Sequence, residues 1–94
     1  MNDSDTAKTL LNLRAEVDAI DLQILDLLKS RMALAKKMGV LKKSKGSPLR
    51  DTVRENEILR RLAHENIQRE PRLPENDLKT LYVQIMHICL KSQE

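Results

Sequence analysis

Arg31 is the residue whose chemistry fits its position in the sequence least well, because it interrupts a stripe of apolar residues. Read at alternating steps of four and three, the remaining members of the stripe are Leu13, Val17, Ile20, Ile24, Leu27, Leu34, Met38 and Leu41. A guanidinium keeps its proton, and burying it without a counter-ion is strongly unfavourable. Arg31 therefore predicts an anion at this position, either a carboxylate of the protein in an ion pair or an anionic ligand.

Two further cations can be placed relative to Arg31 by helical geometry. Lys42 follows it by eleven residues, which is three turns plus about 20°, so both side chains project from one side of a helix. Taken alone, Lys42 is better explained as a solvated lysine of the basic run 36–45. Arg14 precedes Arg31 by about 25 Å along the axis, too far to share a small ligand within one chain. In an antiparallel dimer, Arg14 of one chain would come level with residues 31–42 of the other.

The remaining polar candidates lie near the ends of two later helices. Asp51 and Glu55 share one helical face, with Arg54 between them in the sequence. They form either an acidic first turn favoured by the helix dipole and paired with Arg54, or an acceptor for a hydroxyl group beside a cation. Gln93 continues an apolar face four residues beyond Cys89, or is a solvated residue at the chain end. Cys89 by itself reads as a small core residue.

The elements that must position these residues are helices. Of the 94 residues, 40% are hydrophobic and 33% charged, with one aromatic residue and two glycines, which predicts a single all-α domain over residues 1–94. The periodicity predicts helices at about 6–44, 49–66 and 75–93. Gly39 interrupts the first of them, and close approach of a ligand or a neighbouring helix would explain it.

The length of the first helix predicts a homodimer. It would be a rod of roughly 55 to 60 Å, whereas a compact monomer of this size has a radius of gyration of about 12 Å. Two shorter helices cannot cover both ends of its apolar stripe, so we expect a second copy of the chain to do so.

Composition excludes several classes of function. The single cysteine cannot form an internal disulfide, and residues 1–8 are polar with no apolar signal region, so a reducing cytoplasm is expected. No segment is apolar enough to span a membrane. The net charge of +3 requires no nucleic-acid partner, although it favours an anionic small molecule. Neither histidine has metal-ligand spacing to a Cys or Asp, so no metal site is predicted.

Taken together, these residues resemble those of the all-helical chorismate mutases. The carrying segments are LRAEVDAIDLQILDLLKSRMALAKKMGVLK (13–42), SPLRDTVRE (47–55) and LKSQ (90–93). The resemblance implies three helices, the first very long, in an intertwined homodimer. It is strongest to the mutase domain often fused ahead of prephenate dehydratase, so a fused or associated prephenate dehydratase is an expected partner.

The resemblance implies the Claisen rearrangement of chorismate to prephenate, a step of phenylalanine and tyrosine biosynthesis that needs no metal or cofactor. Negative charge accumulates on the ether oxygen in the transition state, and fixed donors at that oxygen accelerate the step. Lys42 and Gln93 match the two donors of the family.

The family pattern also implies how the substrate is held. Arg31 and Arg14 of the second chain would bind the two carboxylates, because a guanidinium can grip a carboxylate with two parallel hydrogen bonds. Glu55, helped by Asp51, would accept a hydrogen bond from the ring hydroxyl, and Arg54 would line the site. The implied catalytic residues are Arg31, Lys42, Glu55 and Gln93.

Cys89 departs from the family pattern, since a serine is common at this place. A thiol is a weak hydrogen-bond donor, so a substrate contact at Cys89 would be lost or taken over by a backbone group.

The sequence leaves three alternative functions open. A lyase that cleaves pyruvate from isochorismate would share the long helix and its cations, although Asp51, Arg54 and Glu55 favour the mutase. A basic helical dimer could bind nucleic acid or an acidic protein through residues 36–45, but this leaves Arg31 and Gln93 unexplained. A regulatory mutase fold without activity is the third.

Overall fold

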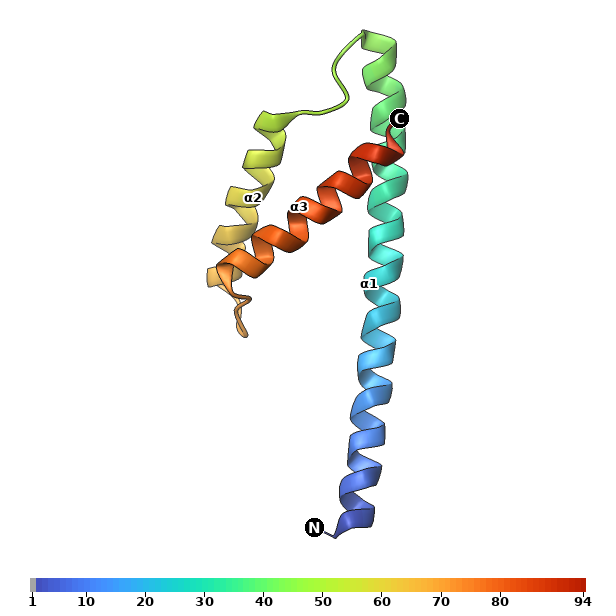
Figure 1. Cartoon of the computed structure of the whole chain (residues 1–94), viewed down its shortest axis with the longest axis vertical. Helices are drawn as coiled ribbons and strands as arrows, with labels where there is room; N and C mark the ends of the chain where they lie inside the picture. Colours follow the sequence, from blue (N-terminus) through green and yellow to red (C-terminus); the bar gives the residue numbers. More distant parts are fainter. Residues whose placement is uncertain (1) are drawn as a thin grey trace. The chain divides into compact units, whose positions relative to one another are not determined.

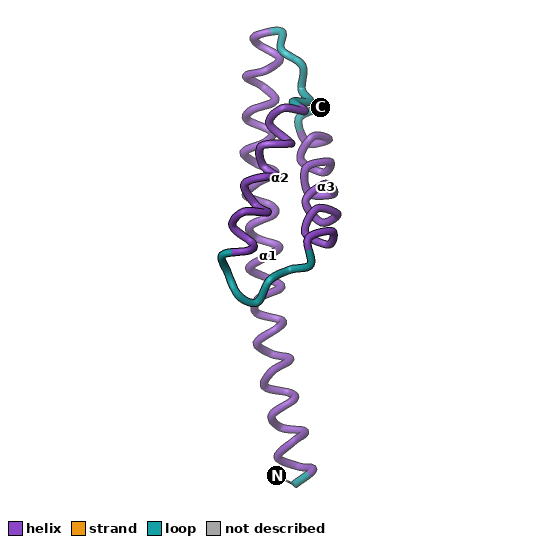
Figure 2. The backbone as a smooth tube through the Cα atoms, turned by 90° about the vertical axis from the view of Figure 1, so that its left-hand side faces the viewer, coloured by secondary structure: helices purple, strands orange, loops and turns teal. Residues whose placement is uncertain are grey.

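The computed structural model describes residues 2–94, which form three α-helices and no strand (Figure 1). The helices are α1 (Asp3–Lys45), α2 (Thr52–Ile67) and α3 (Glu75–Ser92). Figure 2 shows the two loops that join them. The prediction of an all-α chain with a very long first helix is confirmed. Within residues 2–94, no helix is both long and apolar enough to cross a membrane.

Contacts divide the chain into two compact units, one ending at Ser30 and the other comprising Arg31–Glu94. The boundary lies inside α1. In the first unit every described residue is exposed except Leu28, which is half-buried. The stripe residues Leu13, Ile20 and Leu27 keep 52%, 53% and 70% of their surface exposed in the single chain.

The first helix begins three residues earlier than expected because Asn2 caps it. The Asn2 Oδ1 accepts a hydrogen bond from the Asp5 backbone N–H at 2.9 Å, and the Thr6 hydroxyl donates to the Asn2 carbonyl at 3.1 Å. A side-chain oxygen that satisfies a free N–H of the first turn is the usual role of asparagine at a helix start.

The end of α1 is set by Gly46, which has a φ of 69°. Its N–H donates to the Lys43 carbonyl at 3.2 Å, and the Ser47 N–H donates to the Lys42 carbonyl at 2.9 Å. This pair of bonds is the Schellman motif, in which a glycine in the left-handed region closes a helix. The chain therefore turns directly after the segment that carries Lys42.

The second helix begins at Thr52 rather than at about 49, because Asp51 is its N-cap. Asp51 has an extended backbone (φ −124°, ψ 92°), and its carboxylate accepts from the Arg54 backbone N–H at 3.0 Å. Residues 48–50 consequently lie in a loop. α2 then packs against α3, which runs beside it in the opposite direction (Figures 1 and 2).

The buried positions of the second unit are few, and half of them are small residues. They are Ala35, Gly39, Leu78, Met86, Cys89 and Gln93. No large side chain among the described residues is completely buried. Leu34, Met38 and Leu41 of the predicted stripe remain exposed in this unit too, so the single chain leaves much apolar surface in contact with water.

Candidate active site

The last part of α1 meets the end of the chain through a hydrogen bond between Lys42 and Gln93. The Lys42 ammonium donates to the Gln93 Oε1 at 3.0 Å and to the Leu49 backbone carbonyl at 2.7 Å. An ammonium has three protons to donate, so one remains for a further acceptor. Lys42 is half-buried, and these contacts overturn its interpretation as a solvated member of a lysine run.

Gln93 is a buried polar residue rather than a frayed chain end, with 9% of its surface exposed. It follows α3 directly, and its backbone N–H donates to the Leu90 carbonyl at 3.0 Å. Because its amide oxygen faces the ammonium of Lys42, its Nε2 protons are available to another acceptor. Two donors that are 51 positions apart in the sequence thus lie side by side.

The start of α2 contributes acidic groups, but their partners differ from those expected. The Glu55 carboxylate accepts from the Arg50 Nε at 3.3 Å, and its side chain is 25% exposed. The Arg54 guanidinium lies 3.6 Å from the Glu57 carboxylate instead of pairing with Asp51 or Glu55. Sequence reasoning missed Arg50, because a residue in an irregular loop carries no helical periodicity.

A cavity of about 800 Å³ lies beside Lys42, where the 46–51 loop follows α1. Its lining includes Lys42, Lys45 and Arg50 together with Asp51, over the apolar side chains of Met38 and Leu41. Three cations against one carboxylate favour an anionic ligand of small-molecule size. The structure therefore brings Lys42 and Asp51 to one cavity, with Gln93 hydrogen-bonded to Lys42.

Arg31 is half-buried in the single chain rather than buried, because its stripe neighbours Leu27 and Leu34 are themselves exposed. Among residues 2–94, no carboxylate lies within 4.0 Å of it. The ion pair that the sequence left open is therefore not formed within residues 2–94. Arg14 is exposed and belongs to the first unit, so its part in the site stays a prediction.

Cys89 is buried, with 4% of its surface exposed, as expected of a small core residue. Its backbone carbonyl accepts from the Ser92 hydroxyl at 2.7 Å. A contact between its thiol and a substrate stays a prediction.

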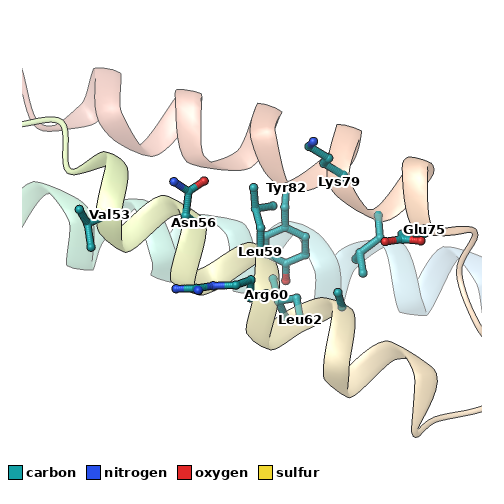
Figure 3. A pocket seen from close by; sticks show the side chains of 10 residues that line it. Val53, Asn56, Leu59, Arg60, Leu62, Glu75, Lys79 and Tyr82 are labelled. Atoms are coloured by element: carbon teal, nitrogen blue, oxygen red, sulfur yellow. The ribbon is translucent and has the colours of Figure 1, made fainter.

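A second cavity, of about 580 Å³, lies between α2 and α3 and contains none of the predicted site residues (Figure 3). Val53, Leu59, Leu62, Leu78 and Tyr82 line it, with Arg60, Glu75 and Lys79 among its polar residues. Farther along α2, a hydrogen bond from Arg69 lowers the pKa of the exposed Glu65 carboxyl. Within residues 2–94, no group of three or more His, Cys, Asp or Glu side chains could hold a metal ion.

Comparisons with known proteins agree with the resemblance seen in the sequence. The chain is 34% identical over 86 residues to a bifunctional chorismate mutase/prephenate dehydratase of Aquifex aeolicus (strain VF5). That alignment covers 90% of this chain and 24% of the relative, so the chain spans about a quarter of the relative's length. The fold is similar to a solved conserved hypothetical protein from Pyrococcus furiosus, with a TM-score of 0.72 and 32% identity over 92% of this chain and 96% of that one.

A family model also matches most of the sequence. The model for chorismate mutase type II matches residues 13–94, a range that contains α2, α3, most of α1 and every predicted site residue. The chain therefore belongs to the chorismate mutase type II family.

Proposed function

We propose that this chain catalyses the rearrangement of chorismate to prephenate. The observation that carries the proposal is the Lys42–Gln93 contact of 3.0 Å, which joins the two residues that match the family's donors to the ether oxygen. Membership of the family and the name of the Aquifex relative support the same activity.

For this reaction the protein needs only to position the substrate and to stabilise the charge of the transition state. Chorismate must fold so that its enolpyruvyl group lies over the ring, and a site that binds this conformer removes part of the entropic barrier. The rearrangement then breaks the ether C–O bond and forms a C–C bond within one molecule. It needs no nucleophile and no proton transfer.

Lys42 and Gln93 are suited to stabilise the charge that develops on the ether oxygen. The Leu49 carbonyl and the Gln93 Oε1 hold the ammonium in place, so its third proton has a fixed direction. The Gln93 Nε2 supplies the second donor. Donors fixed before the reaction need no reorganisation when the charge appears, so they favour the transition state over the bound substrate.

The carboxylates and the hydroxyl of chorismate require further groups. Arg31, which has no carboxylate partner in the described chain, would bind one carboxylate, and Arg14 of a second chain the other. The Glu55 oxygen that does not contact Arg50 would accept a hydrogen bond from the ring hydroxyl. Asp51, at the start of α2, would assist Glu55, and Arg54 would line the site.

The apolar stripe of α1 supports a homodimer. The exposure of residues such as Leu13, Ile20 and Leu27 supports a second copy covering them, because a helix of this kind gains most of its stability from packing. An intertwined arrangement of two such chains would bring Arg14 to the partner's Lys42. A prephenate dehydratase, fused or separate, would consume the product, as the name of the Aquifex relative suggests.

The direct test offers chorismate and isochorismate separately to the purified protein and measures prephenate and pyruvate. We expect prephenate from chorismate without added metal or cofactor. If the protein released pyruvate from isochorismate and formed no prephenate from chorismate, it would be the lyase instead. If the folded protein turned over neither substrate but bound RNA with a steep dependence on salt concentration, the proposal would be wrong and the basic run 36–45 would become the functional surface.

A further inference from the structure

Gly39 is a buried glycine in the last two turns of α1, one turn before Lys42. Glycine is a poorer helix former than alanine, so its place in a long helix calls for a reason. Conformational freedom is not that reason, because Gly39 does not have a positive φ, whereas Gly46 does.

The structure supplies a steric reason. A Cβ built on Gly39 would lie 2.9 Å from each of three atoms of Gln93, namely its Cα, its Cβ and its carbonyl oxygen. Two of these atoms belong to the backbone, so no side-chain rotation relieves the contact. Any side chain at position 39 would force the end of the chain away from α1.

Such a displacement would act on the Lys42–Gln93 contact. The Gln93 backbone is held by its hydrogen bond to the Leu90 carbonyl at the end of α3, so residue 93 moves together with that helix end. Its amide would then leave hydrogen-bonding distance of the Lys42 ammonium, which is 3.0 Å away. Small displacements of this kind matter, since a shift of about 1 Å in a catalytic group can slow a reaction by about 100-fold.

We propose that Gly39 is a positioning residue: the missing side chain lets Gln93 lie against α1 and places its amide beside Lys42. The effect of Gly39 on turnover rests on the proposed chorismate mutase activity. Its effect on the position of Gln93 does not, so the two can be tested separately.

The test is Gly39→Ala in the 94-residue chain, with two measurements. The kcat for chorismate should fall by about 10 to 100-fold while KM changes by less than about threefold, because the donor to the ether oxygen is displaced and the carboxylate-binding groups are not. The side-chain amide resonance of Gln93 in ¹⁵N NMR spectra, identified from its loss in Gln93→Ala, should shift.

The matched control is Ala33→Gly, a change of the same size at an exposed position of α1. It alters helix propensity without approaching Gln93, and should leave both kcat and the Gln93 resonance near their wild-type values. In Gln93→Ala, adding Gly39→Ala should reduce kcat by less than about threefold, because the amide that Gly39 positions is already absent.

The outcomes separate the inference from the proposed function. A wild-type kcat and an unmoved Gln93 resonance in Gly39→Ala would overturn the inference. If the wild-type chain proved inactive on chorismate while the resonance still shifted, the positioning role would stand and the proposed activity would not. If Gly39→Ala failed to fold, the same variant without residues 93 and 94 should regain the helical circular dichroism signal, because all three atoms that the new Cβ would meet are then absent. A truncated variant that stayed unfolded would contradict the steric contact.

Discussion

The two units of the chain differ in how they treat their apolar residues. In the unit that ends at Ser30, every described residue but Leu28 is exposed, including the whole Leu13–Leu27 part of the stripe. In the unit from Arg31 onward, small residues of α1 are buried, Gly39 lies directly against Gln93, and α2 packs on α3. Both units have helical sequences with apolar faces, yet only the second finds partners for some of them within its own chain.

Side chains of the proposed site already contact one another in the second unit, whereas the first unit exposes the stripe that the proposed dimer would cover. Lys42, Gln93 and the Arg50–Glu55 pair already have the contacts that orient them. Arg14 is exposed, and it lies in the first unit, where none of the described residues is buried. If a second chain covers that stripe, it also gives Arg14 an environment in which a guanidinium can grip a ligand.

The largest effect should come from removing the central cation of the second unit. Lys42→Ala removes a proposed donor to the ether oxygen together with the ammonium that contacts Gln93, so we expect kcat/KM for chorismate to fall by about 1,000-fold. The control Lys37→Ala removes an exposed lysine of the same run and should stay within about twofold of wild type. Equal losses in the two variants would mean that the basic run acts through its charge alone.

A charge placed in the stripe of the first unit should break the proposed interface. Ile20→Lys puts an ammonium where two copies would bury an isoleucine. It should weaken dimerisation by about 100-fold or more, as measured by sedimentation equilibrium. Ala15→Lys introduces the same group on the opposite side of the helix and should leave the dimer intact. Unchanged association of Ile20→Lys would remove the stripe from the interface.

The neutral amide of Gln93 predicts activity across neutral pH, and Gln93→Glu should change that dependence. A carboxyl group donates a hydrogen bond only while protonated, and an unperturbed Glu has a pKa of about 4.3. Activity of the variant should therefore be greatest in acid and fall about tenfold per unit as the pH rises above that pKa. Parallel pH profiles of kcat for the wild type and the variant test this. A flat profile in the variant would contradict the role of Gln93 as a donor.

A smaller effect is expected from Arg50, the residue that sequence reasoning did not find. Arg50→Ala frees the Glu55 carboxylate, and KM for chorismate should rise by about two to fivefold with little change in kcat, because an exposed ion pair is worth little. Arg60→Ala removes an arginine that lines the other cavity and serves as the control. An unchanged KM in Arg50→Ala would show that Glu55 needs no orientation by Arg50.

Local signals made much of the fold predictable from the sequence. The three helices follow from the periodicity of the apolar residues. Periodicity does not show which residue caps a helix, so the predicted start of α2 at about 49 precedes the observed one at Thr52. The resemblance to the family named Lys42 and Gln93 as donors. Neither periodicity nor resemblance gave the contact between Gly39 and Gln93, because 54 positions separate them and their meeting depends on the course of the whole chain between them.

The ion pairs were also beyond prediction, for a different reason. Glu55 pairs with Arg50 in the preceding loop, and Arg54 pairs with Glu57 one turn farther along α2. Several partners lie within reach of each of these long side chains, and exposed pairs differ little in energy. Arg31 shows a related limit. Its burial depends on the exposed stripe residues around it and on whatever packs against them.

Mixed dimers give the most direct test of a site completed by a second copy of the chain. Arg14→Ala and Lys42→Ala chains are purified separately, shown to be nearly inactive, unfolded together and refolded as an equal mixture. If Arg14 acts across the interface, half of the dimers are mixed and each has one intact site, so about a quarter of wild-type activity should return. Verified mixed dimers that stay as inactive as their parents would contradict the shared site.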